Sequence, residues 1–252
     1  MKRIWSYLRH SDPKLRFSWY CLQLGLFVFP FFPALGAIGL FLSGLITLGQ
    51  QWSKISKYPF YQGFIFLSIF LVITVIFAVD KFAAFLGLFN LLPYFALFIG
   101  WSRLIQTTAQ LQRISWILTI NSVPVVIIGL GELFLGWNTP KLWSSIFGWT
   151  LVAGGNPPNR MASTFNYANI LAGYLAIVFI LSLGLWLQEW RRFRTRRQGD
   201  RETRRKGDKE IGRQGELSSP SLFLFVTFAV IANFAGLILT NSRNAWVIAL
   251  VA

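Results

Sequence analysis

Two arginine motifs have the residue types and spacing best suited to chemistry. Arg160 lies in AGGNPPNRMASTFNYAN at 153–169, and Arg243 ends TNSR at 240–243. A guanidinium can clamp phosphate bidentately, which lysine cannot do. A helix that begins near Asn166 would add free backbone N–H groups, which favour an anion. The two motifs therefore predict a site for a phosphate group. The alternative is that both arginines anchor helix ends by reaching to lipid headgroups.

Polar neighbours support a site around these arginines. Ser163 and Thr164 are suitable caps for a helix that starts near Asn166. Asn166 and Asn169 lie three residues apart, so on such a helix they would share a face. Two amides are costly against lipid, and we expect them to face the protein interior or a polar ligand. Ser242 is the corresponding polar neighbour of the second arginine.

Three further polar positions are weaker candidates. Glu132 lies near the end of an apolar run, and a carboxylate at that depth is a functional candidate by default. Trp137 follows about one turn later and marks the membrane interface, so the alternative is that Glu132 reaches water. Lys141 is placed on the same side of the membrane, without a motif around it. The adjacent pair Asp80–Lys81 is interpreted as a cap at a tight turn.

Metal and histidine chemistry is excluded by count. The sequence has one histidine, His10, in a basic tail, and one cysteine, Cys21, in an apolar segment. Neither a Ser-His-Asp triad nor a zinc site nor a disulfide can be assembled from them. We therefore expect no metal and no cofactor, and no catalytic residue is assigned.

The composition identifies the class of protein that must position these side chains. Of 252 residues, 54% are hydrophobic, 17% aromatic and only 13% charged. Because soluble domains carry about 25% charged residues, a water-soluble enzyme and a disordered chain are excluded. Spans of roughly 20 residues leave room for about six or seven helices. The expected fold is all-α, a polytopic transmembrane helix bundle.

The apolar runs place most of the spans. Pro93 and Pro124 fall inside two of them, which membrane helices tolerate because neighbouring groups satisfy the freed carbonyls. The expected spans are 60–79, 82–101, 114–136, 166–187 and 220–240. Residues 19–48 contain Pro30 and Pro33 and form either a short bent hairpin or one long tilted helix.

The basic residues set the predicted orientation. Of the 24 lysines and arginines, five lie in residues 1–16 and eleven in 189–217. Because basic flanks mark the cytoplasmic side, the tail 1–18 and the segment 189–219 are predicted to be inside, and loop 137–165 outside. Both ends of 19–48 then face the cytoplasm, which favours the hairpin. The chain is expected to be an uncleaved, multi-pass protein of the inner (plasma) membrane.

The basic segment 189–219 contains a charged repeat with a period of eight residues. RRQGDRET, RRKGDKEI and GRQGEL follow one another from residue 196 to 217. Such a segment cannot bury a core, so we expect a solvated and mobile loop between the spans 19–188 and the last part, 220–252. The alternative, binding of anionic lipid, is weakened by six acidic residues in the loop. Nucleic-acid binding is not expected, because the charge flanks apolar runs.

Four segments give the sequence a resemblance to a known family. NRMASTFNYANILAGYL at 159–175 and LTNSRNAWVIAL at 239–250 resemble the O-antigen ligase and polymerase superfamily. FLGLFNLLPYFALF at 85–98 and LGWNTPKLW at 135–143 look like its cyanobacterial branch, some members of which were named putative inorganic-carbon transporters. The resemblance covers nearly the whole chain except the charged repeat.

The resemblance implies a metal-independent glycosyltransferase of surface polysaccharide biosynthesis. The donor would be a glycan on undecaprenyl pyrophosphate at the outer face of the inner membrane, and the acceptor a glycan or a lipid. Arg160 and Arg243 would hold the pyrophosphate and stabilise its growing charge. In the family a large outer loop and a catalytic histidine follow this region. They are absent from residues 1–252, which end inside an apolar run, so we expect an N-terminal part of a longer protein.

Two other functions remain as alternatives. A transporter, for bicarbonate or a lipid-linked sugar, would show internal repeats with paired broken helices near mid-membrane. No such repeat is evident between the halves of the sequence. A structural membrane protein is the third hypothesis.

Overall fold

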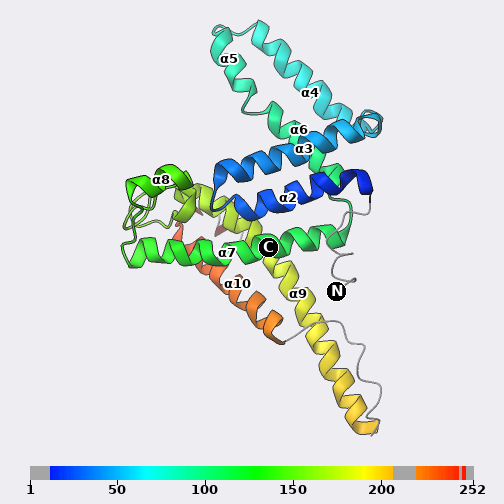
Figure 1. Cartoon of the computed structure of the whole chain (residues 1–252), viewed down its shortest axis with the longest axis vertical. Coiled ribbons are helices and arrows are strands. Elements are labelled where there is room, and N and C mark those ends of the chain that lie inside the picture. The colour runs from blue at the N-terminus through cyan, green and yellow to red at the C-terminus, as the bar shows by residue number, and fades with distance from the viewer. Residues whose placement is uncertain (1–11, 207–219, 244–245, 248–252) are drawn as a thin grey trace. The chain divides into compact units, whose positions relative to one another are not determined.

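The computed structural model describes residues 12–206, 220–243 and 246–247, without the side chains of 141, 196–206 and 220 (Figure 1). Of the described residues 79% are helical, and no strand is found among them. Six helical segments within those ranges are long and apolar enough to cross a membrane, and one of them, Lys81–Leu104, is interrupted by a turn at residues 89–91. The predicted all-α polytopic bundle is therefore confirmed. The chain divides into two compact units, residues 1–111 and 112–252, which are taken in turn.

The first unit begins with a helical hairpin. Helix α2 covers Arg16–Val28 and helix α3 covers Pro33–Ile55, with Pro33 in the first turn of α3. The predicted bend at Pro30 and Pro33 is confirmed, because the chain turns over residues 29–32. The 13 residues of α2 rise about 20 Å, less than the ~30 Å of hydrocarbon, whereas the 23 residues of α3 are long enough to cross. That the region crosses an even number of times stays a prediction.

The span expected at 82–101 is not one continuous helix. After α4 (Pro59–Ile76), α5 covers Lys81–Leu88 and α6 covers Leu92–Leu104. The interruption falls just before Pro93, because proline lacks an N–H donor and its ring clashes with the carbonyl four residues earlier. The predicted cap at the start of this span is confirmed: the Asp80 carboxylate accepts a hydrogen bond from the Ala83 amide at 2.9 Å.

Small residues let α6 approach α3 closely. A Cβ on Gly100 would overlap the backbone carbonyl of Gly44. Beside this contact the Trp101 indole Nε1 donates to the Ser43 hydroxyl at 3.0 Å. Phenylalanines join α6 to α4, with the rings of Phe64 and Phe98 5.3 Å apart. The outward side of α4 is apolar and exposed, as expected of a helix that faces lipid.

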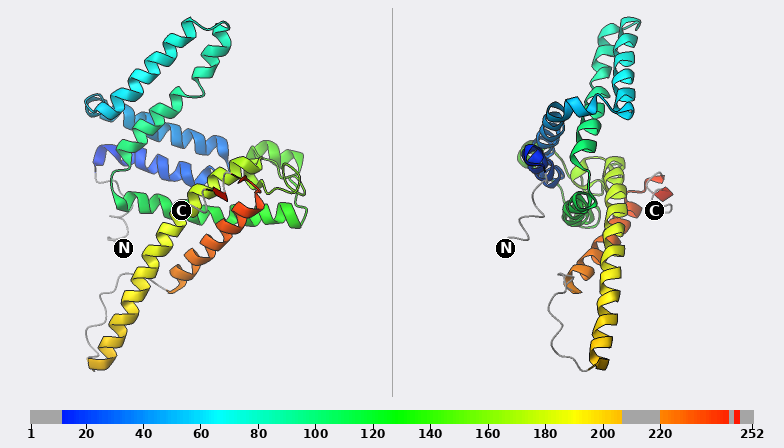
Figure 2. Two further views of the ribbon diagram at one scale, coloured as in Figure 1. Left: turned by 180° about the vertical axis from the view of Figure 1, so that it is seen from behind. Right: turned by 90° about the vertical axis from the view of Figure 1, so that its right-hand side faces the viewer.

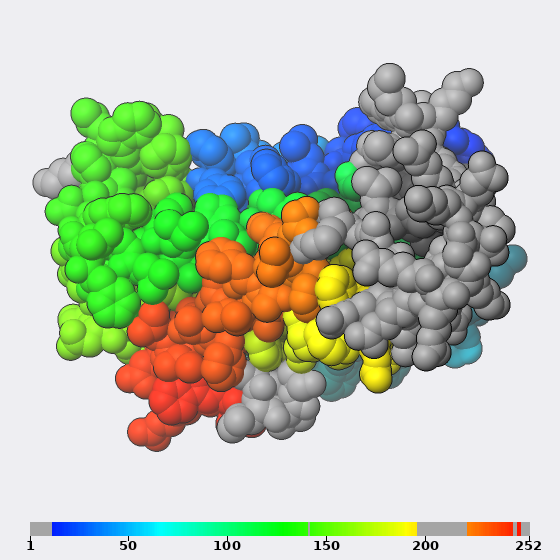
Figure 3. Space-filling view, turned by 90° about the horizontal axis from the view of Figure 1, so that it is seen from below, coloured from blue at the N-terminus to red at the C-terminus, as the bar shows by residue number. Residues whose placement is uncertain are grey.

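The second unit is built on three long helices. Helix α7 covers Thr108–Phe134, and its main part lies in this unit; it continues through Pro124 as the sequence predicted. Helices α9 (Ala168–Lys206) and α10 (Pro220–Leu239) lie side by side (Figure 2). The Trp186 indole on α9 donates to the Thr227 hydroxyl on α10 at 3.0 Å. The space-filling view shows α10 in orange against α7 in green and α9 in yellow (Figure 3).

Helix α9 differs from its prediction at both ends. It begins at Ala168, two residues after the expected start, and it continues to Lys206. Residues 189–206 are therefore helical and not an irregular loop. They contain no proline and are rich in arginine, which has a high helix propensity. The rest of the expected loop, 207–219, lies outside the described residues.

Candidate functional site

The candidate site is formed by loop 137–165 and by the ends of α9 and α10. One side chain, Glu132 near the end of α7, holds the loop at two places. Its Oε2 accepts hydrogen bonds from the amides of Ala162 at 3.0 Å and Ser163 at 2.7 Å, and its Oε1 accepts from Val152 at 3.3 Å. The side chain is fully buried. The alternative that Glu132 reaches water is therefore wrong.

The loop has its own internal structure. Helix α8 covers Lys141–Phe147 and ends at Gly148 in a left-handed conformation. Thr139 and Leu151 then pair across the loop: the Thr139 amide donates to the Leu151 carbonyl at 3.3 Å, and the Leu151 amide donates to the Thr139 hydroxyl at 3.0 Å. The 3₁₀ helix η2 (Ser163–Phe165) closes the loop. These contacts make the loop a defined scaffold.

A tight turn presents Arg160. The Asn159 amide donates to the Gly154 carbonyl at 2.7 Å, which closes the turn. Gly155 has a φ of +88°, and a Cβ there would overlap the carbonyl of Arg160. Only glycine satisfies both requirements without strain. The glycines and prolines at 154–158 therefore form an irregular turn that precedes Arg160.

The Arg160 side chain joins three segments that are distant in sequence. Its Nε donates to the carbonyl of Thr240 at 2.8 Å, and one Nη donates to the Asn169 amide oxygen at 2.5 Å. The next residue extends this contact, because the Met161 amide donates to the Leu239 carbonyl at 3.0 Å. The loop, the first turn of α9 and the end of α10 are thus tied at one guanidinium.

The same guanidinium keeps binding capacity. Of its five N–H donors, these contacts use two, and the side chain is partly exposed. Arg243 follows Thr240 by three residues and is exposed. Ser242, which lies between Thr240 and Arg243, is buried, and its carbonyl accepts from the Trp246 amide at 3.1 Å. The structure thus brings the Arg160 side chain to the backbone segment that carries Arg243.

Two predictions about the polar neighbours were wrong. Asn166 does not share a helical face with Asn169, because it precedes α9 in a left-handed conformation with a φ of +59°. Its side-chain oxygen accepts from the Thr150 amide at 2.6 Å, so it organises the loop. Ser163 does not cap α9 either. Its hydroxyl donates to the Val125 carbonyl of α7 at 2.7 Å. The residue order alone did not show that a 3₁₀ turn would separate these residues from the helix.

The other candidates take smaller parts. Lys141 begins α8, and its side chain lies outside the described residues, as does His10. No group of three metal-ligating side chains was found in the ranges that the structure describes.

The sequence did not reveal that the Thr240 carbonyl accepts a hydrogen bond from Arg160. For Glu132 a signal existed, since an isolated carboxylate in an apolar run requires donors nearby.

Comparison with protein-family models, with curated proteins and with solved structures gave no match for this chain.

Proposed function

We propose that the chain is part of a membrane glycosyltransferase that uses a glycan carried on undecaprenyl pyrophosphate. The observation that carries the proposal is the link from Arg160 to the Thr240 carbonyl, three residues before the exposed Arg243. Two guanidinium groups on one short stretch of structure suit a diphosphate, which carries two adjacent anionic groups. The resemblance of both motifs to the O-antigen ligase and polymerase superfamily supports the same assignment.

The proposed chemistry is displacement at the anomeric carbon of the donor glycan. An acceptor hydroxyl forms the new bond to that carbon, and the bond to the pyrophosphate oxygen breaks. The leaving pyrophosphate keeps the electron pair, and Arg160 and Arg243 stabilise its negative charge. Electrostatic stabilisation of this kind is often the largest catalytic term. The base that takes the hydroxyl proton is not assigned to any residue of this sequence.

Positioning of Arg160 fits this role. Its contacts with Thr240 and Asn169 restrict the guanidinium before any ligand arrives. A group whose orientation is already fixed loses little conformational entropy on binding. Arg243 is exposed, and its ordering would accompany binding. Replacing Arg160 would therefore disturb the fold as well as ligand binding. Replacing Arg243 tests binding more directly.

A transporter remains the second candidate, for bicarbonate or a lipid-linked sugar. The break between α5 and α6 favours it, because interrupted helices form the substrate sites of many transporters. Such sites use paired interruptions in corresponding helices. In the described part of the second unit, α7 and α10 run without a break. The hydrogen bonds of Glu132 and Arg160 lie at one end of the helices of the second unit and not near mid-membrane, which favours the transferase.

The binding test uses the purified chain in detergent and undecaprenyl pyrophosphate as the ligand. Replacing Arg243 by glutamine should weaken its affinity about tenfold or more, because a charged hydrogen bond contributes roughly 1.5–3 kcal/mol. Undecaprenyl monophosphate should bind more weakly than the pyrophosphate and respond less to the change. Arg194→Gln, an exposed arginine near the far end of α9, is the matched control. Equal affinities for Arg243→Gln and wild type would refute the pyrophosphate site.

The cellular test separates the two candidate functions. In the organism that carries the gene, Arg243→Gln should reduce surface polysaccharide while leaving the protein level and carbon uptake unchanged. Loss of carbon uptake with intact polysaccharide would instead support transport.

A further inference from the structure

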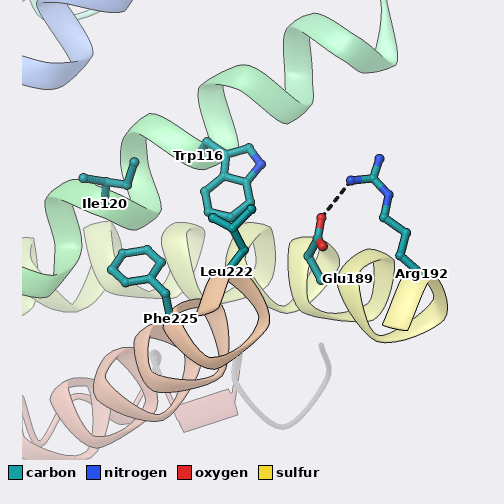
Figure 4. Close-up of a pocket in the computed structure, with 6 residues that line it drawn as sticks. All are labelled: Trp116, Ile120, Glu189, Arg192, Leu222 and Phe225. Atoms are coloured by element: carbon teal, nitrogen blue, oxygen red, sulfur yellow. Dashed lines mark hydrogen bonds and ion pairs between the residues drawn. The ribbon is translucent and has the colours of Figure 1, made fainter. Parts of the chain in front are cut away.

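A groove lies at the opposite end of the second unit from Arg160. Six residues of three helices line it, and its volume is about 520 Å³ (Figure 4). Glu189 of α9 stands 21 residues after Ala168, the first residue of the helix, which corresponds to about 30 Å along its axis. That distance matches the hydrocarbon thickness of a bilayer. The groove and the arginine site therefore belong to opposite membrane surfaces.

Most of the groove is apolar. Trp116 and Ile120 of α7 face Leu222 and Phe225 of α10 across it. All four side chains belong to helices that are apolar enough to span a membrane. Acyl chains pack against such walls without leaving polar groups unpaired. The walls favour an occupant with hydrocarbon chains.

The polar end of the groove contains the carboxylate of Glu189, and a hydrogen bond is formed by one of its two oxygens. Glu189 is 3% exposed, and its Oε1 accepts from an Nη of Arg192 at 2.8 Å. Its Oε2 is buried and has no hydrogen-bond partner among the residues that the structure describes. A buried carboxylate oxygen without a donor is costly, so a ligand that donates there gains the whole interaction. The side chain of Arg192 is 40% exposed and has further donors for an anion.

We propose that the groove binds a membrane phospholipid whose headgroup pairs a phosphate with an N–H or O–H donor. The donor would hydrogen-bond to Oε2 of Glu189, the phosphate would contact Arg192, and the acyl chains would lie along the four apolar residues. Phosphatidylethanolamine and phosphatidylglycerol meet this requirement. Phosphatidylcholine carries the same phosphate without a donor. The site is separate from the proposed pyrophosphate site and does not depend on it.

The test measures which lipids stay bound to the detergent-purified chain in native mass spectrometry. Each of the three lipids is added at equal concentration. The wild type should retain phosphatidylethanolamine and phosphatidylglycerol about tenfold more than phosphatidylcholine, the ratio expected for one charged hydrogen bond. Glu189→Leu should remove this preference, and Arg192→Gln should lower retention of all three lipids. Arg191→Gln, the neighbouring exposed arginine outside the groove, should match the wild type.

A folding control accompanies the variants. Size-exclusion profiles and melting temperatures show whether each variant stays folded. If Glu189→Leu does not, it is replaced by Glu189→Met, which has a similar length and no hydrogen-bonding oxygen. Equal retention of phosphatidylcholine and phosphatidylethanolamine by the wild type would overturn the proposal. A preference that survives the loss of the Glu189 carboxylate would overturn it as well.

Discussion

Glu132 shows how one side chain shapes the site without contacting a ligand. Three backbone amides, of Val152, Ala162 and Ser163, donate to its two oxygens. These amides lie in a loop, where the Glu132 carboxylate takes the place of the carbonyl acceptors that a helix or strand would supply. Without the carboxylate, the amides of the buried residues Ala162 and Ser163 would be donors without acceptors, which is costly. Glu132 therefore determines the loop conformation that presents Arg160.

Replacing Glu132 by glutamine should loosen the loop. Glutamine has one acceptor oxygen, so it can accept either from Val152 or from Ala162 and Ser163. Its N–H₂ group then faces the remaining amide donors, with which it cannot form a hydrogen bond. The free energy of opening the loop should fall by about 2 kcal/mol. When opening is fast relative to cleavage, proteolysis follows the open population, so cleavage by an aromatic-specific protease should accelerate about 30-fold. The measurement is limited proteolysis of the detergent-purified protein.

Asp80→Asn provides the control for that substitution. It makes the same chemical change at the cap of α5, in the other unit. Cleavage within loop 137–165 should stay at the wild-type rate. If Glu132→Gln were also cleaved at the wild-type rate, Glu132 would not hold the loop.

At the scale of elements, glycines decide where helices of the first unit meet. Gly100 on α6 and Gly44 on α3 bring the two backbones together, and a hydrogen bond from Trp101 to Ser43 lies beside them. Helices in membranes gain little from apolar burial against lipid, so close backbone approach is a main source of their association. The apolar runs predicted the helices, but they did not indicate which faces would touch.

Gly100→Ala should therefore destabilise the first unit. The added Cβ would overlap the Gly44 carbonyl, and α3 and α6 would have to move apart. Overpacking of this kind costs about 1–3 kcal/mol. The measurement is thermal unfolding of the purified protein in detergent.

Gly63→Ala on α4 is the matched control, because no heavy atom lies within 4 Å of the position of the new Cβ. Its melting temperature should equal that of the wild type or exceed it slightly, since alanine favours the helix. A melting temperature for Gly100→Ala as high as that of Gly63→Ala would contradict the proposed contact.

At the scale of the whole molecule, the six apolar helices make this a multi-pass membrane protein. Its orientation is a prediction from the basic residues. The segment that follows residue 189 contains eleven lysines and arginines up to residue 217, and loop 137–165 contains two. The positive-inside rule places the first at the cytoplasmic surface and the second outside. The pyrophosphate proposal requires this orientation, because its substrate is used at the outer face.

Cysteine labelling in intact cells tests the orientation. In a Cys21→Ser background, Ala153→Cys in the loop should react with a membrane-impermeant maleimide. Thr195→Cys on α9 should react only after permeabilisation. Both positions are exposed, so differences in burial do not explain the result. If only Thr195→Cys were labelled in intact cells, the predicted orientation would be wrong, and the transferase proposal would lose its basis.

The sequence by itself determined the class of the protein, because the length of each apolar run decides whether it can cross a bilayer, and that length is visible in the sequence. It also placed the bend near Pro30 and Pro33 and the polar motif around Arg160. Tertiary structure alone decided that Glu132 holds the loop, that Asn166 stays outside α9, and that Arg160 reaches the carbonyl of Thr240. Each of these contacts joins a side chain to backbone groups distant in sequence. Apart from proline, every residue carries the same backbone N–H and C=O groups, so no pattern of side chains indicates which of these groups will be used.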